Sequence, residues 1–368
     1  MEKYYIAAIC GAQQIGSARL QKLLDFFGNA KEIWAAEHGE LEKVGLPSKA
    51  LESFIDFRGK NPNAPEKLID YCIETGVKIC SIIDEDYPPI LKEIPLPPPV
   101  FYYYGQLQPF AERIAMVGTR DNTPYGQRVA MEVAEELAAA GITIVSGAAR
   151  GIDTYSHIGA MKYGRTVAVL GCGIAYAFTG SREKVIRQIA ENGVVMTNYN
   201  PSQRAGAETF PARNRIIAGL SRGVIMVEAG ERSGTNITCG YAGDYGRDVF
   251  ALPGSIYSEK SIGCHNLIRD GAVLIRSADD ILEFYDWAKN NSVDKNISDK
   301  KNIDNETFKL EGVEKKVFDA IPSGDFISTD EILMKVDDIS FSEFSNAIIQ
   351  LDLKNCIVEQ DGEYSRKI

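Results

Sequence analysis

Short apolar runs alternate with amphipathic segments between residues 114 and 275. The segment Gln127–Ala140 places Val129, Val133 and Leu137 on one stripe at helical spacing, so it predicts a helix. Strands that are apolar throughout and alternate with helices are typical of a parallel sheet covered on both faces. We therefore expect an α/β fold with an extended, Rossmann-like, doubly wound and mostly parallel sheet. Its predicted strands are I-A-M-V (114–117), I-T-I-V (142–145), T-V-A-V-L (166–170), V-V-M-T (194–197), V-I-M-V (224–227), D-V-F-A-L (248–252) and A-V-L-I (272–275).

The N-terminal part of the chain has the pattern of short helices. In residues 17–28, S-A-R-L-Q-K-L-L-D-F-F-G has helical periodicity and a glycine stop. This pattern predicts a helical domain over residues 1–80, resembling a SAM or helix-hairpin-helix bundle. Residues 84–105 are rich in proline and end in aromatic residues, which predicts an extended strap. This strap leads the predicted Rossmann-like domain, residues 81–288.

A polar segment separates the predicted sheet from the C-terminal part. Residues 289–308 are rich in Asn, Asp and Lys, which predicts a flexible linker. Residues 309–368 have a pattern of three helices and a two-stranded wing, which predicts a winged-helix domain. Its third helix carries Glu343 and Asp352 and little positive charge, so a protein-docking or regulatory role is favoured over reading of the DNA major groove.

Charge and composition narrow the classes of function. The chain of 368 residues has a net charge of -11, yet residues 113–216 carry twelve Lys and Arg against eight Asp and Glu. This distribution favours one dedicated anion site over a generally basic surface. The seven cysteines are scattered without a C-x-x-C pair, which argues against a disulfide framework or a zinc site. Neither a signal peptide nor an apolar run of eighteen residues is found, so we expect a cytoplasmic protein without membrane contact.

Small and cationic residues follow three of the predicted strands. Glycine allows close approach to an anion, and hydroxyl groups, amides and helix N-termini stabilise it. The helix F-P-A-R-N-R-I-I-A-G-L adds two arginines beside these loops, and Phe178 and Phe210 offer faces on which bases could stack. The predicted anion-binding residues are Gly118, Thr119, Arg120, Ser146, Gly147, Arg150, Gly151, Arg213, Asn214, Arg215, Ser233, Gly234 and Thr235.

Catalytic and cofactor-binding patterns are sparse. The G-x-G-x-x-G fingerprint of dinucleotide-binding enzymes and the phosphate loop of nucleotide hydrolases are both absent. Asp153 is interpreted as a cap of the following helix, and Glu228 as a partner of an arginine in preference to a general base. Many anion-binding loops without reaction apparatus favour a ligand with several phosphates, such as single-stranded nucleic acid, that is held and not transformed. We therefore expect neither enzymatic activity nor a cofactor or metal.

Several long motifs in fixed order resemble the DNA processing protein A family (DprA, also called Smf). They run over residues 80–280 and include Y-P-P-I-L-K-E-I-P, V-G-T-R, S-G-A-A-R-G-I-D-T-Y-S-H, F-P-A-R-N-R-I-I-A-G-L-S, V-E-A-G-E-R-S-G-T-N-I-T and G-C-H-N-L-I-R-D-G-A. The resemblance implies a homodimer that binds and protects single-stranded DNA and loads the recombinase RecA onto it during natural transformation. Arg120, the S-G-A-A-R-G loop and Arg213 to Arg215 would line its DNA pocket.

One segment departs from the family pattern. After A-V-L-G-C-G, the family usually continues with an acidic residue and Tyr-Pro, whereas this chain has Ala175, Phe178 and Thr179 at those positions, and Gly180 where lysine is common. Arg182 or Lys184 is the candidate replacement for the lost cation. The alternative function is a phosphoribohydrolase on a related fold. The stretch E-A-G-E-R-S-G-T-N-I-T lacks the catalytic glutamate of such enzymes, which disfavours hydrolysis.

Overall fold

A computed structural model describes residues 1–180, 182–287, 312–322, 326–336, 339–340, 343–344, 347–348, 351, 356–360 and 363–366. The chain forms two compact units, Met1–Ala288 and Lys289–Ile368, which we describe separately. The predicted linker, residues 289–308, lies outside the described residues. The further division of the first unit at residue 80 stays a prediction.

A nine-stranded sheet forms the centre of the first unit. Its strand order is β1-β2-β6-β5-β4-β3-β7-β8-β9, and every pairing from β6 to β9 is parallel. The predicted α/β class and the mostly parallel sheet are therefore confirmed, and all seven predicted strands occur. These are β3 (Arg113–Val117), β4 (Thr143–Ser146), β5 (Thr166–Val169), β6 (Val194–Thr197), β7 (Gly223–Met226), β8 (Asp248–Ala251) and β9 (Val273–Leu274).

The sheet also has two strands that the apolar pattern did not predict. β2 (Val100–Gly105) pairs antiparallel with β6, and β1 (Lys78–Ser81) pairs antiparallel with β2 at the edge. Strand β2 is the aromatic end of the proline-rich strap, where Phe101 is fully buried. The strap is not extended throughout, because Pro89–Lys92 forms the short helix α7. Proline is tolerated there because the first helical position needs no N–H donor.

Helices cover both faces of the sheet, as the continuous apolar strands require. In β3, Ile114 and Met116 pack under α8 and α9, whereas Ala115 and Val117 belong to the core beneath α11 and α12. Successive residues of a strand point to opposite faces, so both sets are buried. One face carries α8 (Pro124–Ala139), α9 (Ile152–Ala160), α10 (Glu183–Asn192) and α14 (Ala278–Phe284), and the other carries α11 (Thr209–Gly219), α12 (Thr235–Asp244) and α13 (Ile262–Arg269).

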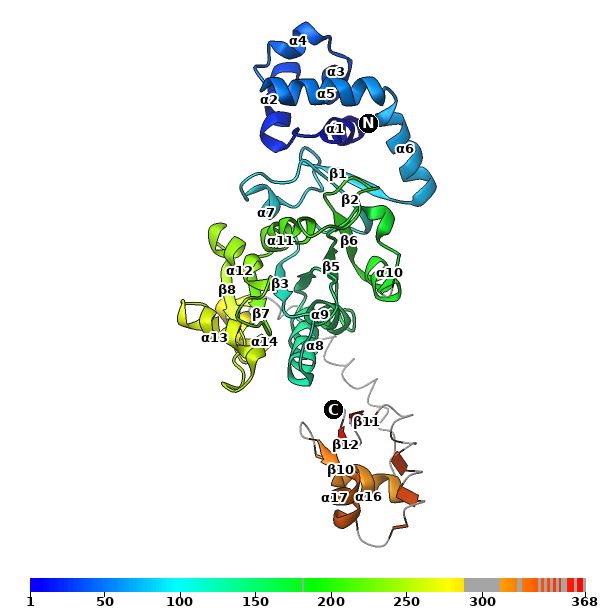
Figure 1. The fold of residues 1–368 in the computed structure, drawn as a ribbon, viewed down its shortest axis with the longest axis vertical. Helices are drawn as coiled ribbons and strands as arrows, with labels where there is room; N and C mark the ends of the chain where they lie inside the picture. Colours follow the sequence, from blue (N-terminus) through cyan, green and yellow to red (C-terminus); the bar gives the residue numbers. More distant parts are fainter. Residues whose placement is uncertain are drawn as a thin grey trace. The chain divides into compact units, whose positions relative to one another are not determined.

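Six helices precede the sheet and share a hydrophobic core with it. Ile6, Leu23 and Phe54 are fully buried and belong to the same cluster as Val100 of β2. Figure 1 shows these helices, in blue, next to β1 and β2. The predicted helical character of this region is therefore observed, whereas its assignment as a SAM-like domain stays a prediction. The helices are α1 (Glu2–Cys10), α2 (Ser17–Phe27), α3 (Ala30–Ala35), α4 (His38–Glu42), α5 (Ser48–Lys60) and α6 (Ala64–Thr75).

The second unit has a small core of its own. Val317, Ile332 and Leu351 are fully buried in it. Its three-stranded sheet has the order β10-β12-β11, with β11 and β12 antiparallel. The predicted third helix falls largely outside the described residues, so the winged-helix assignment stays a prediction. The elements are α16 (Gly312–Ala320), β10 (Ile327–Ser328), α17 (Thr329–Lys335), β11 (Ile357–Gln360) and β12 (Glu363–Arg366).

The helices of both units differ from membrane spans in length and hydropathy. Within the described ranges, none combines enough residues with enough apolar character to cross a bilayer.

Candidate nucleic-acid interface

The predicted anion-binding loops meet at one edge of the sheet because of its topology. Strand β3 lies between β4 and β7, so the chain winds outward in one direction through β4, β5 and β6 and then crosses over to β7. In doubly wound sheets, ligands bind at such a switch point, outside the carboxyl ends of the strands. The loops that follow β3, β4 and β7 contain most of the predicted site residues.

Arg120 lies on the first of these loops with its side chain exposed. Its guanidinium lies 5.2 Å from the centroid of the Phe210 ring, which comes from the first turn of α11. A cation above an aromatic face keeps its outer N–H groups free for a phosphate while the ring limits its motion. The structure therefore brings together a predicted cation and a predicted stacking ring that are ninety residues apart in the sequence.

The neighbouring carboxylate is neutralised within the protein. Asp121 accepts a hydrogen bond from the ammonium group of Lys260 at 2.7 Å. This bond and the positive charge of Lys260 lower the pKa of Asp121, and Arg150 adds to the effect. The repulsion that Asp121 would exert on an anion near Arg120 is therefore reduced.

Arg213 lies inside the protein. Its side chain is 3% exposed, and its guanidinium donates to the carbonyl oxygen of Gly147 at 2.7 Å and to that of Val169. Burial lowers the pKa of Arg213 to about 10, although Asp153 favours its charged form. Arg213 thus joins the ends of β4 and β5. The expectation of two arginines facing an open groove is not met at this position.

The loop S-G-A-A-R-G is stabilised by an internal carboxylate. Asp153, in the first turn of α9, accepts a hydrogen bond from the Ala149 amide at 3.3 Å, and the Gly147 amide also favours its charged form. Burial nevertheless raises the pKa of Asp153. The interpretation of Asp153 as a cap of the following helix is therefore wrong: it bonds to the preceding loop. A Cβ on Gly147 would lie 2.6 Å from both Arg213 Nη2 and Asp153 Oδ2, so glycine is required there.

Gly151 holds the first two loops against each other. Its φ is 88°, and a Cβ at this position would lie 2.4 Å from the carbonyl oxygen of Thr119. The same oxygen accepts a hydrogen bond from the Ile152 amide at 3.2 Å. Gly118 is equally restricted, because a Cβ there would meet the Ile152 side chain at 2.5 Å. These glycines let the loops approach, which leaves Arg120 and Arg150 exposed at their tips.

Arg215 points away from Arg213. Its Nη1 donates to the carbonyl oxygen of Leu96 on the strap at 2.8 Å. Residues two apart on a helix do not share a face, which explains why the two arginines of R-N-R separate. Asn214, between them, is half-buried. Arg213 and Arg215 therefore belong to different surroundings, and the structure does not bring Arg215 to the Arg120 loop.

The segment that departs from the family pattern follows β5. Phe178 is half-buried between Tyr104, with ring centroids 4.8 Å apart, and the guanidinium of Arg187, 4.7 Å from its ring. Ala175, Thr179 and Gly180 are exposed.

Arg182 reaches back from this segment to the loop after β4. Its Nη1 donates to the carbonyl oxygen of Ala148, a residue with a φ of 51°. The structure thus supplies a cation beside the S-G-A-A-R-G loop, as the sequence suggested, whereas Lys184 is simply exposed.

Glu228 lies two residues after the end of β7, and its buried side chain stabilises the loops at the carboxyl edge of the sheet. It is 2% exposed, and its carboxylate accepts hydrogen bonds from the Thr123 hydroxyl at 2.6 Å and the Thr123 amide at 2.9 Å. Its partner is therefore the N-cap of α8, and the expected pairing with an arginine is wrong. Its carbonyl oxygen also accepts from the Thr119 amide at 2.8 Å, which ties the loops after β3 and β7 together.

The last predicted loop forms the start of α12. The Ser233 hydroxyl donates to that of Thr235 at 3.0 Å, and Gly234 is exposed. The sequence analysis did not include Arg204, whose guanidinium lies 6.0 Å from the ring centroid of Tyr176. The only sequence signal was its position in a polar loop after a predicted strand.

Comparisons with known proteins agree with this architecture. The family model of DNA recombination-mediator protein A matches residues 78–286. The protein Smf of Synechocystis sp. is 37% identical over 288 residues, covering 76% of this chain and 72% of Smf. The DNA processing protein DprA of Streptococcus pneumoniae is 41% identical over 209 residues, covering 56% of this chain and 74% of DprA.

Solved structures show the same relationship. The crystal structure of DprA from Streptococcus pneumoniae superposes with a TM-score of 0.64 at 32% identity, covering 77% of this chain and 98% of that one. DprA from Helicobacter pylori, studied for its single-stranded DNA binding mode, gives a TM-score of 0.52 at 28% identity and covers 57% and 95% of the two chains. The matched segment contains the whole parallel sheet and its loops, so this chain belongs to the DNA recombination-mediator protein A family.

Proposed function

We propose that this protein binds single-stranded DNA at the carboxyl edge of its sheet and acts as a recombination mediator. The observation that carries the proposal is the pairing of the exposed Arg120 with the Phe210 ring. A phosphate would contact the guanidinium while an unpaired base stacks on the aromatic surface. Arg150 and Arg182 extend the positive charge along the adjoining loop. The relative from Helicobacter pylori supports the proposal, because its structure concerns single-stranded DNA binding.

The predicted site residues divide into two roles in this proposal. Arg120, Arg150, Phe210 and the Ser233–Thr235 loop would contact the strand. The buried residues Ser146, Gly147, Gly151 and Arg213 would hold the loops in position. Phe178 and Arg215, which the structure packs elsewhere, would contact DNA only where the strand extends beyond this edge.

The further parts of the proposal are assembly and partners. We infer a homodimer that transfers its bound strand to RecA without chemical change to the DNA. Strand β9 supports self-association: it forms one edge of the sheet and exposes Val273 and Leu274. An unpaired edge with exposed apolar side chains favours pairing with another chain. The N-terminal helices, as a SAM-like domain, and the C-terminal unit, as a winged helix, would then serve as docking modules.

Fluorescence anisotropy with labelled oligothymidine tests the DNA-binding proposal. The double variant Arg120→Ala/Arg150→Ala should bind at least tenfold more weakly than the wild type. The slope of log affinity against log salt should also become shallower by about 0.7 for each phosphate that the variant no longer neutralises. Arg269→Ala, which removes an exposed cation at the end of α13, is the matched control and should leave affinity unchanged. Equal affinity and salt slope for the double variant and the wild type would remove this edge from the DNA site.

A further inference from the structure

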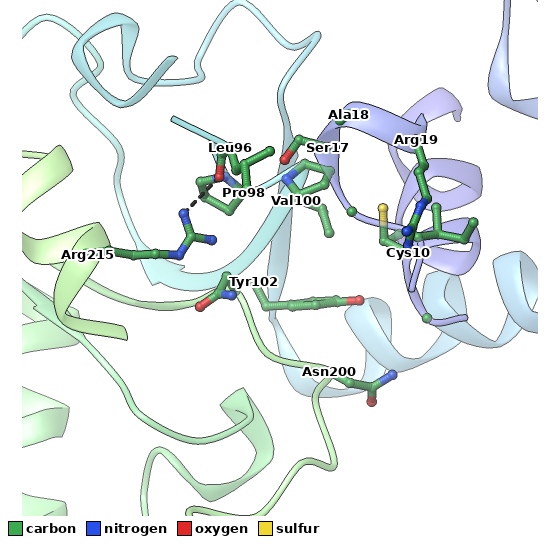
Figure 2. A pocket seen from close by; sticks show the side chains of 16 residues that line it. Cys10, Ser17, Ala18, Arg19, Leu96, Pro98, Val100, Tyr102, Asn200 and Arg215 are labelled. Atoms are coloured by element: carbon green, nitrogen blue, oxygen red, sulfur yellow. Dashed lines mark hydrogen bonds between the residues drawn. The ribbon is translucent and has the colours of Figure 1, made fainter. Parts of the chain in front are cut away.

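A cavity of about 530 Å³ lies between the N-terminal helices and the strap of the first unit. Pockets for small ligands typically have volumes of about 300 to 1,000 Å³. The end of α1, the start of α2, the strap, β2, the loop after β6 and one residue of α11 contribute to its walls. Figure 2 shows Arg19 and Arg215 approaching it from different elements, with Tyr102 between them.

The charges in the cavity favour an anion. The described residues that line it include two arginines, Arg19 and Arg215, and no Asp or Glu. This is unusual in a chain with a net charge of -11. Arg19 donates from Nη1 to the carbonyl oxygen of Gln14, and Arg215 donates from Nη1 to that of Leu96. Because a guanidinium has five N–H donors, these bonds orient both groups and leave donors for a ligand.

The strap contributes a residue with unusual backbone geometry to the wall. Leu96, which lines the cavity, has a φ of 54° and is 63% exposed. Strained backbone of this kind concentrates at functional sites.

The apolar part of the cavity suits a planar group. Pro98, Pro99 and Val100 line it together with Tyr102, whose side chain is buried. Burial raises the pKa of the Tyr102 hydroxyl, so it stays neutral and adds no negative charge. A ligand that matches this cavity has a phosphate for an arginine and a flat ring for the apolar wall. These are the groups of a nucleoside monophosphate.

We propose that this cavity binds a nucleoside monophosphate group, separately from the carboxyl-edge site around Arg120. The group has two sources, a free mononucleotide or one nucleotide of a DNA strand. Arg19 binds the phosphate, and the base packs against the apolar wall that Pro98, Pro99 and Val100 form. Arg215 lies on the other side of Tyr102 from Arg19. This proposal does not rest on DNA binding at the carboxyl edge.

Isothermal titration of the full-length protein with dCMP, dAMP and inorganic phosphate tests the site. The two nucleotides should bind more tightly than phosphate, and Arg19→Gln should weaken them about tenfold, as the loss of one charge-assisted hydrogen bond. Gly16→Leu should also block them, because Gly16 lines the cavity and a Cβ there meets no atom within 4 Å. Gly16→Ser is its small-residue control, and Arg269→Gln is the control for charge.

A second titration with oligothymidine identifies the source of the nucleotide. If Arg19→Gln weakens the mononucleotides and leaves the oligomer unchanged, the cavity serves free nucleotides. If it weakens both, the cavity receives a nucleotide of the strand. Absence of binding by dCMP and dAMP up to millimolar concentration, together with unchanged oligomer binding by Arg19→Gln, would overturn the proposal. A loss of oligomer binding confined to Arg120→Ala/Arg150→Ala would concern the carboxyl edge alone.

Discussion

Replacement of Arg213 by methionine should destabilise the fold instead of merely weakening DNA binding. The substitution keeps the apolar stem but removes the two hydrogen bonds to Gly147 and Val169 and leaves the Asp153 carboxylate without its buried cation. Arg213 and Asp153 interact through their charges without a direct ion pair, and loss of the compensating cation beside a buried carboxylate is expected to cost about 3 kcal/mol. Typical domains have only about 5 to 15 kcal/mol of stability, so the effect should be large.

Urea unfolding followed by tryptophan fluorescence measures this effect. The two tryptophans, Trp34 and Trp287, both belong to the first unit, so their signal reports the part of the chain that contains Arg213. With a slope of about 3 kcal/mol per molar urea, the midpoint should fall by more than about 1 M. Arg215→Met on the same helix is the matched control and should lower stability by less than about 1 kcal/mol, because its side chain is partly exposed.

A double-mutant cycle with Asp153→Asn isolates the pair. The double variant should be more stable than the sum of the single effects predicts, by about 1 to 3 kcal/mol, because it buries no unpaired charge. The reasoning would be refuted if Arg213→Met unfolded at the same urea concentration as the wild type and no longer bound oligothymidine. That result would indicate that Arg213 contacts DNA.

Two further predictions concern other buried positions. Gly151→Ala should destabilise the first unit by about 3 kcal/mol, because it combines a φ of 88° with a contact of 2.4 Å to Thr119; Gly240→Ala, whose Cβ meets no atom within 4 Å, should not destabilise it in the same urea assay. Burial lowers the pKa of His157 to about 3, so the unfolded chain binds a proton that the native chain rejects between about pH 3 and 6.5. Stability should therefore fall by about 1.4 kcal/mol per pH unit below 6.5, and His157→Gln should remove that increment from a pH series of urea midpoints; identical slopes would contradict it.

The sheet was predictable because its seven parallel strands are buried on both faces and hence apolar without interruption. β1 and β2 escaped prediction because the prolines between them suggested only an extended strap. The proline at the first position of α7 is compatible with a helix, so the strap contains one turn of helix that composition alone did not indicate.

The positions of the loops that form the site were predictable from the sequence, but the directions of their side chains were not. Strands β3 and β4 are neighbours, so the loop of residues 118–120 lies beside the loop that ends at Gly151. This proximity was predictable because both loops follow strands of one parallel sheet. The direction of Arg213 depends on Gly147 and Val169, which lie far from it in the sequence. Helical geometry nevertheless carried one usable signal, because residues 213 and 215 cannot share a face. The partner of Glu228 was also unpredictable, because Thr123, whose hydroxyl donates to its carboxylate, lies 105 residues away in the sequence.

Photo-crosslinking of a single-stranded oligomer that contains 5-iododeoxyuridine tests whether DNA lies at the carboxyl edge of the sheet. We expect adducts on the Phe210 ring, because a base should stack beside the Arg120 guanidinium, and we expect their loss in Phe210→Leu. Crosslinks confined to the N-terminal helices or the C-terminal unit, with none on the loops at the carboxyl edge, would contradict this expectation.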